Sequence, residues 1–367
     1  MTAPRDGAEG LLDSMAAVRA YRPEAGRVHT SADWSEVRAG VTADVYFARG
    51  ADVLRRLGRL DTPVVAEVFS QGEGVLCGIE EALDLLQGVP VDVETLAEGE
   101  RFSPKEPVMR IAGAYGAFGL FETAILGCIA SASGWATAAT KVREAAGDSV
   151  VVSFGARHVH PAIASTMERA AVLGGLDGAA SILGARLAGK EPVGTVPHAV
   201  ILVAGDTLPV AQALVADDIP GSVTVLVDTY HDEAEESLRL AEALGPDLGA
   251  IRLDTPAERG GVTPGLVHEV RTRLDRAGFA HVQIFVSGSL TPERIVQLKA
   301  AGAGRFGVGH FVSSAPPIDM TMDLKVVDGK DVAKRGRIPG ITPNPRLRQR
   351  LRGGSVVADG GGSSQRG

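Results

Sequence analysis

Charged, hydroxyl-bearing and glycine residues gather where a series of short apolar segments ends. These polar segments are residues 154–158, 174–178, 194–198, 228–230, 252–255, 287–289 and 307–310. The carboxyl ends of parallel strands share one edge of a sheet, and the active sites of βα barrels lie just beyond that edge. We therefore expect these segments to surround a single site.

Two of the segments are typical of phosphate binding. Ser287 and Gly288 precede a predicted helix, while Gly307 and Gly309 lie at the end of a neighbouring strand. Glycines at such points expose backbone N–H groups to an anion, and the last two loops of a βα barrel frequently hold a phosphate. The alternative is that these residues are turn glycines only.

Carboxylates and an arginine–histidine pair supply the other reactive groups. Asp228 and Asp254 could hold sugar hydroxyls, could hold Mg²⁺ through water, or could cap the helices that follow them. Arg157 beside His158 suits a phosphate or carboxylate, or a structural salt bridge. The lysines of the chain all lie outside these strand ends, which argues against a Schiff-base aldolase.

An alternation of apolar strands and amphipathic helices must position these residues. Strands are predicted at 150–154, 223–227, 250–253, 282–286 and 305–308. Between them, Thr263 and Thr291 each precede a proline, the pattern of a helix N-cap followed by proline, and residues 232–244 carry a helical apolar stripe. Continuously apolar strands alternating with such helices indicate a parallel βα barrel rather than a doubly wound sheet.

The N-terminal half has a different pattern. Strands at 62–69, 74–79 and 106–111 with a helix at 80–86 indicate a separate α/β layer, to which a strand at 321–327 could return. The expected domains are an extension at 1–40, an α/β sandwich with a connecting helix at 41–148, a βα barrel at 149–318, a segment returning to the sandwich at 319–343 and a disordered tail at 344–367.

One segment tests a membrane location. Residues 111–140 carry a single charge, Glu122, and are long enough to span a bilayer. Their Gly, Ala, Ser and Thr content, however, favours a tightly packed internal helix. We therefore expect no membrane association.

Composition narrows the class further. The chain has 367 residues, 46 of them glycine, and a formal net charge of -8, which argues against nucleic acid as a partner. Two cysteines, Cys77 and Cys128, cannot form a disulfide framework or a four-cysteine zinc site. The first residues lack the basic-then-apolar order of a signal peptide, so a cytoplasmic location is expected.

Several of these segments together resemble the nicotinate phosphoribosyltransferases, most of all the short bacterial and archaeal forms. The resemblance runs from about Asp44 to Arg337 through SFGARHVHP, GTVPH, VLVDTYHDE, AIRLDTPAERG, IFVSGSLTPERI and GRFGVGHFV. ADVYFARG resembles the family's Thr-Asp-x-Tyr segment, with Ala43 in place of the threonine. The lysine-rich motifs of the related quinolinate enzymes are not found. No cysteine follows Cys128, so the zinc module of some archaeal relatives is not expected.

The resemblance implies a reaction and a fold. The family transfers the phosphoribosyl group of phosphoribosyl pyrophosphate to nicotinate, giving nicotinate mononucleotide and pyrophosphate in NAD biosynthesis, with ATP as a co-substrate and Mg²⁺ as a cofactor. Its fold is an N-terminal α/β sandwich followed by an incomplete, irregular parallel βα barrel. Its subunits pair head to tail as a homodimer or a multiple of dimers, so that each active site uses residues of the neighbour's N-terminal domain.

The resemblance also implies a role for each site residue. The nicotinate ring and carboxylate would contact Phe154, Arg252, Asp177 and His158, with Tyr46 and Asp44 supplied by a second subunit. The phosphoribosyl and pyrophosphate groups would contact Arg157, Asp228, Asp254, Ser287, Gly288, Gly307 and Gly309, with Mg²⁺ near Asp228 and Asp254. His198, in Gly-Thr-x-x-His, matches the histidine that ATP phosphorylates.

Two alternatives remain open at this point. Arg157 is followed by His158 rather than by a second arginine, so a paralogue acting on another heteroaromatic carboxylate would have nearly the same sequence. A non-catalytic sensor of a phosphoribosyl compound or nucleotide is the other alternative. A phosphate-dependent lyase or isomerase fits less well, because no lysine lies at the strand ends.

Overall fold

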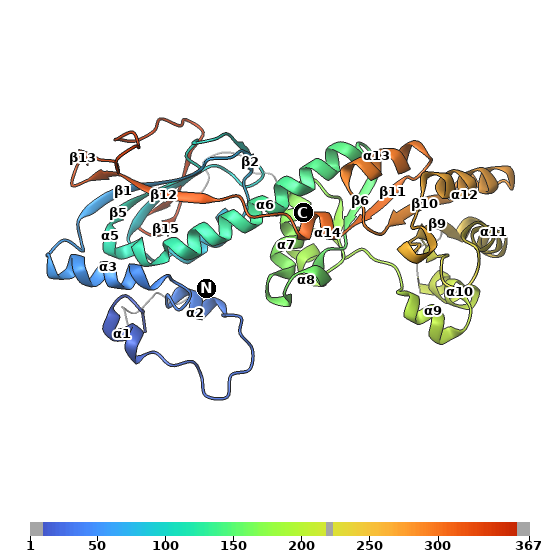
Figure 1. Ribbon diagram of the computed structural model, residues 1–367, viewed down its shortest axis with the longest axis horizontal. Helices are drawn as coiled ribbons and strands as arrows, with labels where there is room; N and C mark the ends of the chain where they lie inside the picture. The colour runs from blue at the N-terminus through green and yellow to red at the C-terminus, as the bar shows by residue number, and fades with distance from the viewer. Residues whose placement is uncertain (1–9, 218–222, 358–367) are drawn as a thin grey trace. The chain divides into compact units, whose positions relative to one another are not determined.

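The computed structural model describes residues 10–217 and 223–357, which divide into two compact units (Figure 1). Unit 1 contains the chain up to Gly134 and again from Pro316, and unit 2 contains Trp135–Ala315. The division falls inside helix α6 (Glu122–Ala146), whereas the sequence placed it after residue 148. The expected extension at 1–40 and tail at 344–367 lie partly outside the described residues.

Unit 1 contains a seven-stranded sheet in which the neighbouring strands that pair are antiparallel. Its order is β13 (Lys330–Asp331), β12 (Met320–Val327), β1 (Pro63–Ser70), β5 (Met109–Ala114), β3 (Val91–Thr95), β14 (Arg348–Arg352) and β15 (Ser355–Val356). A separate two-stranded antiparallel sheet pairs β2 (Gly74–Val75) with β4 (Arg101–Phe102). The pairing of β12 with β1 confirms that the chain returns to the N-terminal layer after the barrel.

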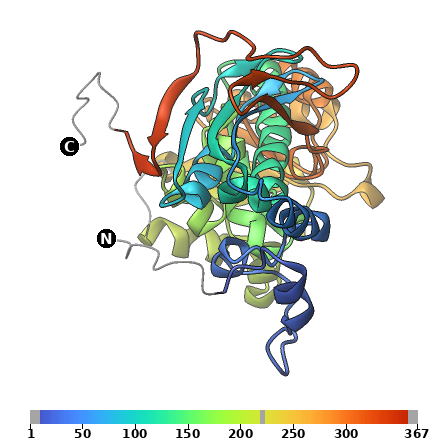
Figure 2. The same cartoon turned by 90° about the vertical axis from the view of Figure 1, so that its left-hand side faces the viewer.

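The expectation of a disordered tail from residue 344 is wrong for the part of it that is described. Strand β14 pairs with β3 on one side and with β15 on the other, and Figure 2 shows these C-terminal strands in red. Leu351 is buried, while Arg350 forms an ion pair with Glu80 at 2.8 Å. The arginines that were predicted to belong to a solvated terminus are instead side chains of a strand that is paired on both sides.

The predicted strand at 74–79 is also shorter than expected. Strand β2 ends at Val75, and helix α4 (Ile79–Leu86) begins directly after Gly78, whose φ is +87°. A Cβ at Gly78 would lie 2.3 Å from the carbonyl oxygen of Cys128. Glycine is thus required both for the left-handed turn and for the close approach of α6.

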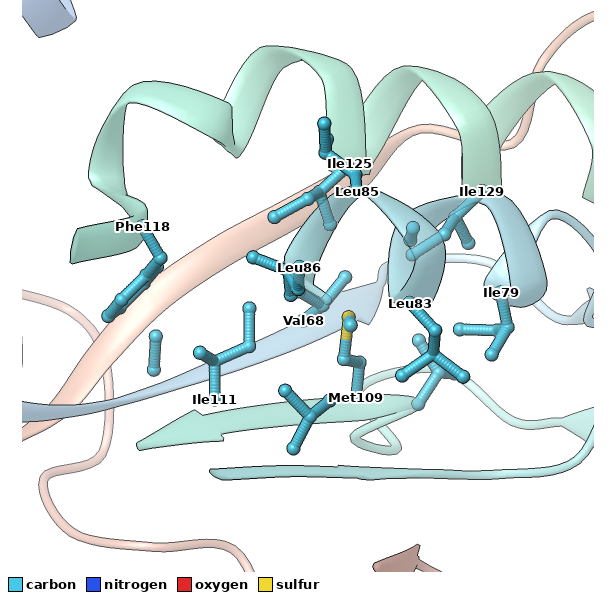
Figure 3. Packing of buried hydrophobic residues seen from close by; sticks show 14 of the residues in the cluster. Val68, Ile79, Leu83, Leu85, Leu86, Met109, Ile111, Phe118, Ile125 and Ile129 are labelled. Atoms are coloured by element: carbon cyan, nitrogen blue, oxygen red, sulfur yellow. The ribbon is translucent and has the colours of Figure 1, made fainter. Parts of the chain in front are cut away.

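The core of unit 1 lies between the sheet and the helices α4 and α6 (Figure 3). Val68, Met109 and Ile111 project from the strands, and Leu86 and Ile129 meet them from the two helices. Burying an aliphatic side chain of this size contributes about 1.5–3 kcal/mol. The remaining helices of this unit are α1 (Met15–Ala20), α2 (Trp34–Arg38), α3 (Val45–Arg56) and α5 (Tyr115–Phe118), with the 3₁₀ turn η1 at Gly119–Phe121.

The apolar segment identified in the sequence forms helices α5, η1 and α6. By length and composition, Tyr115–Ala146 could cross a membrane, and it is the one unbent helix among the described residues that could. Phe118, Ile125 and Ile129 from this segment are fully buried in the core of unit 1. Burial, followed by repulsion from Asp323, raises the pKa of Glu122 to about 7. The segment is thus a core helix, as its small residues predicted.

Unit 2 contains a six-stranded, entirely parallel sheet. Its order is β7 (Gly178–Ala179), β6 (Val150–Ser153), β11 (Arg305–Val308), β10 (Gln283–Ser287), β9 (Leu248–Leu253) and β8 (Val223–Leu226). No pairing joins β7 to β8 among the described residues, so the sheet is curled but incomplete as a barrel. The predicted class, an α/β chain with a sandwich and an incomplete parallel βα barrel, is confirmed.

Helices follow the strands of unit 2 as the sequence predicts. They are α7 (Pro161–Leu173), α8 (Ile182–Leu187), α9 (His198–Ala204), α10 (Thr207–Asp217), α11 (Glu233–Leu244), α12 (Pro264–Arg276), α13 (Pro292–Ala300) and α14 (His310–Ser313). Thr263 and Thr291 accept hydrogen bonds from the backbone as N-caps of α12 and α13. Asp232 caps α11 in the same way.

Substitution by alanine should change the free energy of unfolding in opposite directions at two glycines of α6. A Cβ at Gly134 would lie 2.3 Å from the backbone oxygen of Pro316, whereas a Cβ at Gly127 would meet nothing within 4 Å. Gly134→Ala should lower the free energy of unfolding by about 2 kcal/mol or more, because backbone cannot yield as a side chain does. Gly127→Ala should raise it by up to about 1 kcal/mol through helix propensity. Urea titration of both variants checks this, and equal effects would contradict it.

Candidate functional site

Arg252 forms hydrogen bonds with several side chains at the carboxyl edge of the parallel sheet. Its side chain is 14% exposed and donates to Ser287 Oγ at 2.8 Å, to Thr195 Oγ1 at 2.7 Å and to Asp254 Oδ2 at 3.2 Å. The Ser287 hydroxyl is also within 2.9 Å of Asp254 Oδ1. Burial lowers the pKa of Arg252, and the Asp254 and Asp228 carboxylates oppose that shift. A guanidinium remains charged regardless, so this edge holds a fixed positive charge.

A pocket of about 300 Å³ opens beside this arginine. It is lined by Phe154, Ala156, Arg157, Ala180, Ser181, Gly194, Thr195 and Arg252. The Arg252 guanidinium lies 4.9 Å from the centre of the Phe154 ring, which stacks on Phe285 at 5.8 Å. The pocket therefore offers an aromatic face and two guanidinium groups, which suits a flat anionic ligand.

One glycine in β11 and one directly after it make room for this aromatic wall. A Cβ at Gly307 would lie 2.3 Å from Cε2 of Phe154, and a Cβ at Gly309 would lie 2.6 Å from Cε1 of His158. Ring packing is thus sufficient to explain both glycines. Their predicted contact with a phosphate stays a prediction.

A basic rim lies next to these glycines. His158 packs edge-on against His310, with ring centres 5.7 Å apart, and Arg157 precedes it in the 3₁₀ turn η2 (Ala156–His158). Burial, then the positive charges of Arg157 and His310, lower the pKa of His158. At neutral pH the His158 ring is therefore uncharged, and Arg157 supplies the permanent charge of the rim.

His198 reaches the same edge from the N-terminus of α9. Its Nε2 lies 3.0 Å from Oδ2 of Asp228, a carboxylate that is 1% exposed and follows β8. The other oxygen, Asp228 Oδ1, is buried without a hydrogen-bond partner among the described residues. Burial raises the pKa of Asp228 despite the nearby histidine. A ligand hydroxyl or a metal-bound water would satisfy the orphaned oxygen.

The two carboxylates fit a magnesium ion bound through water. Asp228 offers its unpartnered oxygen, and the neighbouring Asp254 carries hard carboxylate oxygens that accept from Ser287 and Arg252. Oxygen ligands of this type and retained waters are what Mg²⁺ prefers. Gly288, with φ of +93°, turns the chain after β10, and a Cβ there would lie 3.2 Å from Asp254 Oδ1.

Asp177 is not brought to this edge, which corrects the sequence analysis. Segment 174–178 precedes β7 rather than following a strand. Asp177 Oδ2 accepts from the N–H of Val151, near the amino end of β6, and lies 3.4 Å from Arg143. A Cβ at Gly174 would lie 2.3 Å from the carbonyl oxygen of Ala136, so this glycine serves helix packing. Within unit 2, Asp177 therefore has a structural role.

Tyr46 and Asp44 belong to unit 1. Asp44 is the N-cap residue of α3, and Tyr46, in its first turn, is 57% exposed. Tyr46 lines an apolar cavity of about 520 Å³ together with Arg49, Val53, Tyr115 and other residues of this unit. The exposed ring is available to a partner, as the resemblance requires, but this role stays a prediction.

Two residues of the site were not assigned from the sequence. Thr195 was noticed only as part of Gly-Thr-x-x-His, yet it hydrogen-bonds to Arg252 and lines the pocket. Glu168 in α7 is fully buried and hydrogen-bonds to both sides of the pocket. A glutamate in an amphipathic helix is ordinarily exposed to solvent, so the sequence did not indicate that Glu168 would be buried behind the pocket.

Two domain models of one protein family match this chain. Residues 44–133 match the quinolinate phosphoribosyl transferase N-terminal domain, and residues 135–323 match its C-terminal domain. Nicotinate phosphoribosyltransferase pncB1 of Mycobacterium tuberculosis is 32% identical over 255 residues, 66% of this chain and 55% of that protein. This chain thus spans about half the length of that relative. Nicotinate phosphoribosyltransferase pncB2 of the same organism is 32% identical over 324 residues, which are 82% of this chain and 68% of that protein.

Other similar proteins carry a different name. A probable nicotinate-nucleotide pyrophosphorylase [carboxylating] of Archaeoglobus fulgidus is 29% identical to this chain. The match covers 71% of this chain and 93% of that protein. The crystal structure of nicotinate-nucleotide pyrophosphorylase from Pyrococcus furiosus has a TM-score of 0.84 and 38% identity, covering 91% of this chain and 94% of that one.

The buried Asp228 carboxylate predicts a pH-dependent stability. Because its pKa is raised in the folded protein, the ionised form costs stability at neutral pH, and this cost disappears as the pH falls toward the ordinary aspartate value. Asp228→Asn should therefore raise the melting temperature at pH 7.5, with the gain shrinking toward pH 4. Thermal unfolding at both pH values measures this.

Asp275→Asn provides the control, because Asp275 is an exposed carboxylate on α12. It should show no comparable gain at pH 7.5. A melting temperature of Asp228→Asn that is unchanged or lower at pH 7.5 would show that the His198 contact outweighs the cost of burial.

Proposed function

The chain belongs to the quinolinate phosphoribosyl transferase family, and we propose that it transfers the phosphoribosyl group of phosphoribosyl pyrophosphate to nicotinate. The products would be nicotinate mononucleotide and pyrophosphate. The observation that carries this proposal is the pocket in which Arg252 lies over the Phe154 ring. The names of the M. tuberculosis relatives support the same acceptor.

The pocket chemistry favours a pyridine with a single carboxylate. A planar ring would stack on Phe154, and its carboxylate would meet the guanidinium of Arg252, which three hydrogen bonds already hold in place. The described lining residues include two arginines and no lysine. If Arg157 binds the phosphoribosyl or pyrophosphate group, one arginine remains for one carboxylate. Nicotinate meets that condition.

The reaction needs alignment and charge stabilisation rather than a general base. The pyridine nitrogen already carries a lone pair, so it can attack the anomeric carbon as the bond to pyrophosphate breaks. The transition state resembles an oxocarbenium ion with negative charge growing on the leaving group. Arg157 on the rim would stabilise that charge, and Asp228 and Asp254 would hold the ribose hydroxyls. Mg²⁺, held by the two aspartates through water, would neutralise pyrophosphate.

A second subunit would complete the pocket. Tyr46 is exposed on α3 of unit 1, and its ring could close over the face of nicotinate opposite Phe154. We propose that the protein works as a homodimer or a multiple of dimers in which α3 of one subunit serves the neighbour's site.

A second candidate acceptor is quinolinate, a pyridine with two carboxylates. The name of the family and the names of the A. fulgidus and P. furiosus proteins favour it. Transfer to quinolinate would give the same mononucleotide only if one carboxylate leaves as carbon dioxide. The two reactions therefore differ in a measurable product.

The acceptor is tested by incubating the purified protein with phosphoribosyl pyrophosphate, Mg²⁺ and either acid. We expect nicotinate to give pyrophosphate and nicotinate mononucleotide, with at least about tenfold higher kcat/KM than quinolinate because the pocket has one free guanidinium for a carboxylate. Arg252→Lys should lower kcat/KM for nicotinate by about 100-fold, since the lysine ammonium cannot reproduce the three hydrogen bonds that hold the planar guanidinium in place.

The outcome separates three possibilities. Pyrophosphate with carbon dioxide from quinolinate alone would reassign the acceptor and keep the family. Turnover with neither acid, but with another heteroaromatic carboxylate, would indicate a paralogue. Calorimetric binding of phosphoribosyl pyrophosphate without turnover of any acceptor would indicate a sensor.

We also propose that ATP drives the reaction by phosphorylating His198. The side chain is 37% exposed and lies beside Asp228, so its ring is accessible to the γ-phosphoryl group of ATP, with ADP as the leaving group. His198→Ala should abolish the stimulation of nicotinate mononucleotide synthesis by ATP. His268→Ala, which removes an exposed histidine of α12, should retain it. Equal ATP stimulation in wild type and His198→Ala would refute the phosphohistidine role.

A further inference from the structure

Glu168 is a fully buried carboxylate in the middle of α7. Its Oε1 accepts from the hydroxyl of Ser153 at 3.1 Å and from the N–H of Gly155 at 3.2 Å. Its Oε2 accepts from the N–H of Ser181 at 2.6 Å. These donors are all neutral, so hydrogen-bond dipoles rather than a cation hold the carboxylate.

The three donors belong to two different walls of the acceptor pocket. Ser153 and Gly155 flank Phe154, and the same turn continues into Arg157. Ser181 is the N-cap residue of α8 and lines the adjoining wall with Ala180. The two walls follow the paired strands β6 and β7, where the Ala180 N–H donates to the Ser153 carbonyl oxygen at 3.0 Å. Each oxygen of one carboxylate thus holds one wall at the point where this strand pairing ends.

We propose that Glu168 is a positioning residue that fixes the aromatic wall of the acceptor pocket relative to the α8 wall. It does not touch the reacting atoms; it acts through Gly155 and Ser181. This inference rests on the proposed function, because the pocket it shapes is the one assigned to the pyridine acceptor.

The neighbouring packing is arranged around this group. A Cβ at Gly184 of α8 would lie 3.0 Å from the Cβ of Glu168 and 2.6 Å from the Ser181 hydroxyl oxygen. Glycine at this position therefore lets α8 approach α7 closely enough for the Ser181 N–H to reach the carboxylate. A Cβ at Gly155 would lie 2.6 Å from Cε of Met167, the residue before Glu168. Glycine at position 155 therefore lets the Phe154 wall approach α7.

A carboxylate is needed because both of its oxygens accept. In Glu168→Gln the amide presents an NH₂ group toward either Gly155 N–H or Ser181 N–H, and neither can accept. One wall is therefore released while side-chain volume and helix propensity are kept. Since the Phe154 ring would contact the acceptor equally before and during the reaction, its displacement should weaken acceptor binding more than it slows the chemical step.

The test compares wild type, Glu168→Gln and a matched control, Glu236→Gln. Glu236 is also a buried glutamate of unit 2, but its carboxylate pairs with Arg239 and does not line the pocket. In Glu168→Gln the KM for nicotinate should rise roughly tenfold with kcat within about threefold of wild type. Amide hydrogen exchange at Gly155 or Ser181 should accelerate. Glu236→Gln should change neither the KM nor these two amides.

The result that overturns the proposal is an unchanged KM and unchanged exchange at both amides in folded Glu168→Gln. A lower melting temperature with parallel losses in Glu168→Gln and Glu236→Gln would also overturn it, because the role would then be structural only. If wild type turns over no acceptor, the proposed function fails, and the amide exchange still decides whether Glu168 holds the two walls.

A second variant covers the case in which Glu168→Gln does not fold. Ser153→Ala removes only the hydroxyl donor to Oε1 and leaves both backbone donors in place. It should raise the KM for nicotinate by about two- to threefold with kcat unchanged. A KM equal to that of wild type in Ser153→Ala would then overturn the proposal.

Discussion

A buried guanidinium must be matched by acceptors, and in unit 2 this requirement draws separate segments of the chain to one point. Arg252, near the end of β9, is bonded by Ser287 of β10, by Asp254 just beyond β9 and by Thr195 of the long connection between β7 and β8. Losing any one of these acceptors would leave a charged donor poorly solvated. The same bonds aim the guanidinium at the face of Phe154, so the interaction that stabilises the edge also shapes the pocket.

Ring packing imposes a second constraint on this edge. Phe154 and His158 can lie against β11 only because residues 307 and 309 lack a side chain. Gly307 and Gly309, which the sequence analysis assigned to phosphate binding, are thus required for the packing of these two rings. The high glycine content has more than one cause. Gly174 and Gly134 allow close backbone approaches, and Gly78 and Gly288 take positive φ angles.

Much of the fold followed from local patterns. Five of the six parallel strands of unit 2, the N-caps Thr263 and Thr291 and the strand that returns to the first sheet were predicted, because strand hydrophobicity and helix capping are local properties. The two-residue strand β7 is too short to show such a pattern. Strand β14 was missed because an Arg-rich strand has the composition of a solvated tail, and its pairing with β3 joins residues far apart in the chain. Asp177 was misplaced because a turn before a strand looks like one after it.

The sequence by itself indicated which residues form the candidate site and that most of them would share one edge, since parallel strands place their carboxyl ends together. Only the tertiary structure decided how those residues are used. It paired His198 with Asp228, put Arg252 over Phe154 and left one oxygen of Asp228 without a partner. It also assigned Glu168 to the two pocket walls. Such pairings depend on distances between segments that are remote in sequence, and residue type and spacing do not encode those distances.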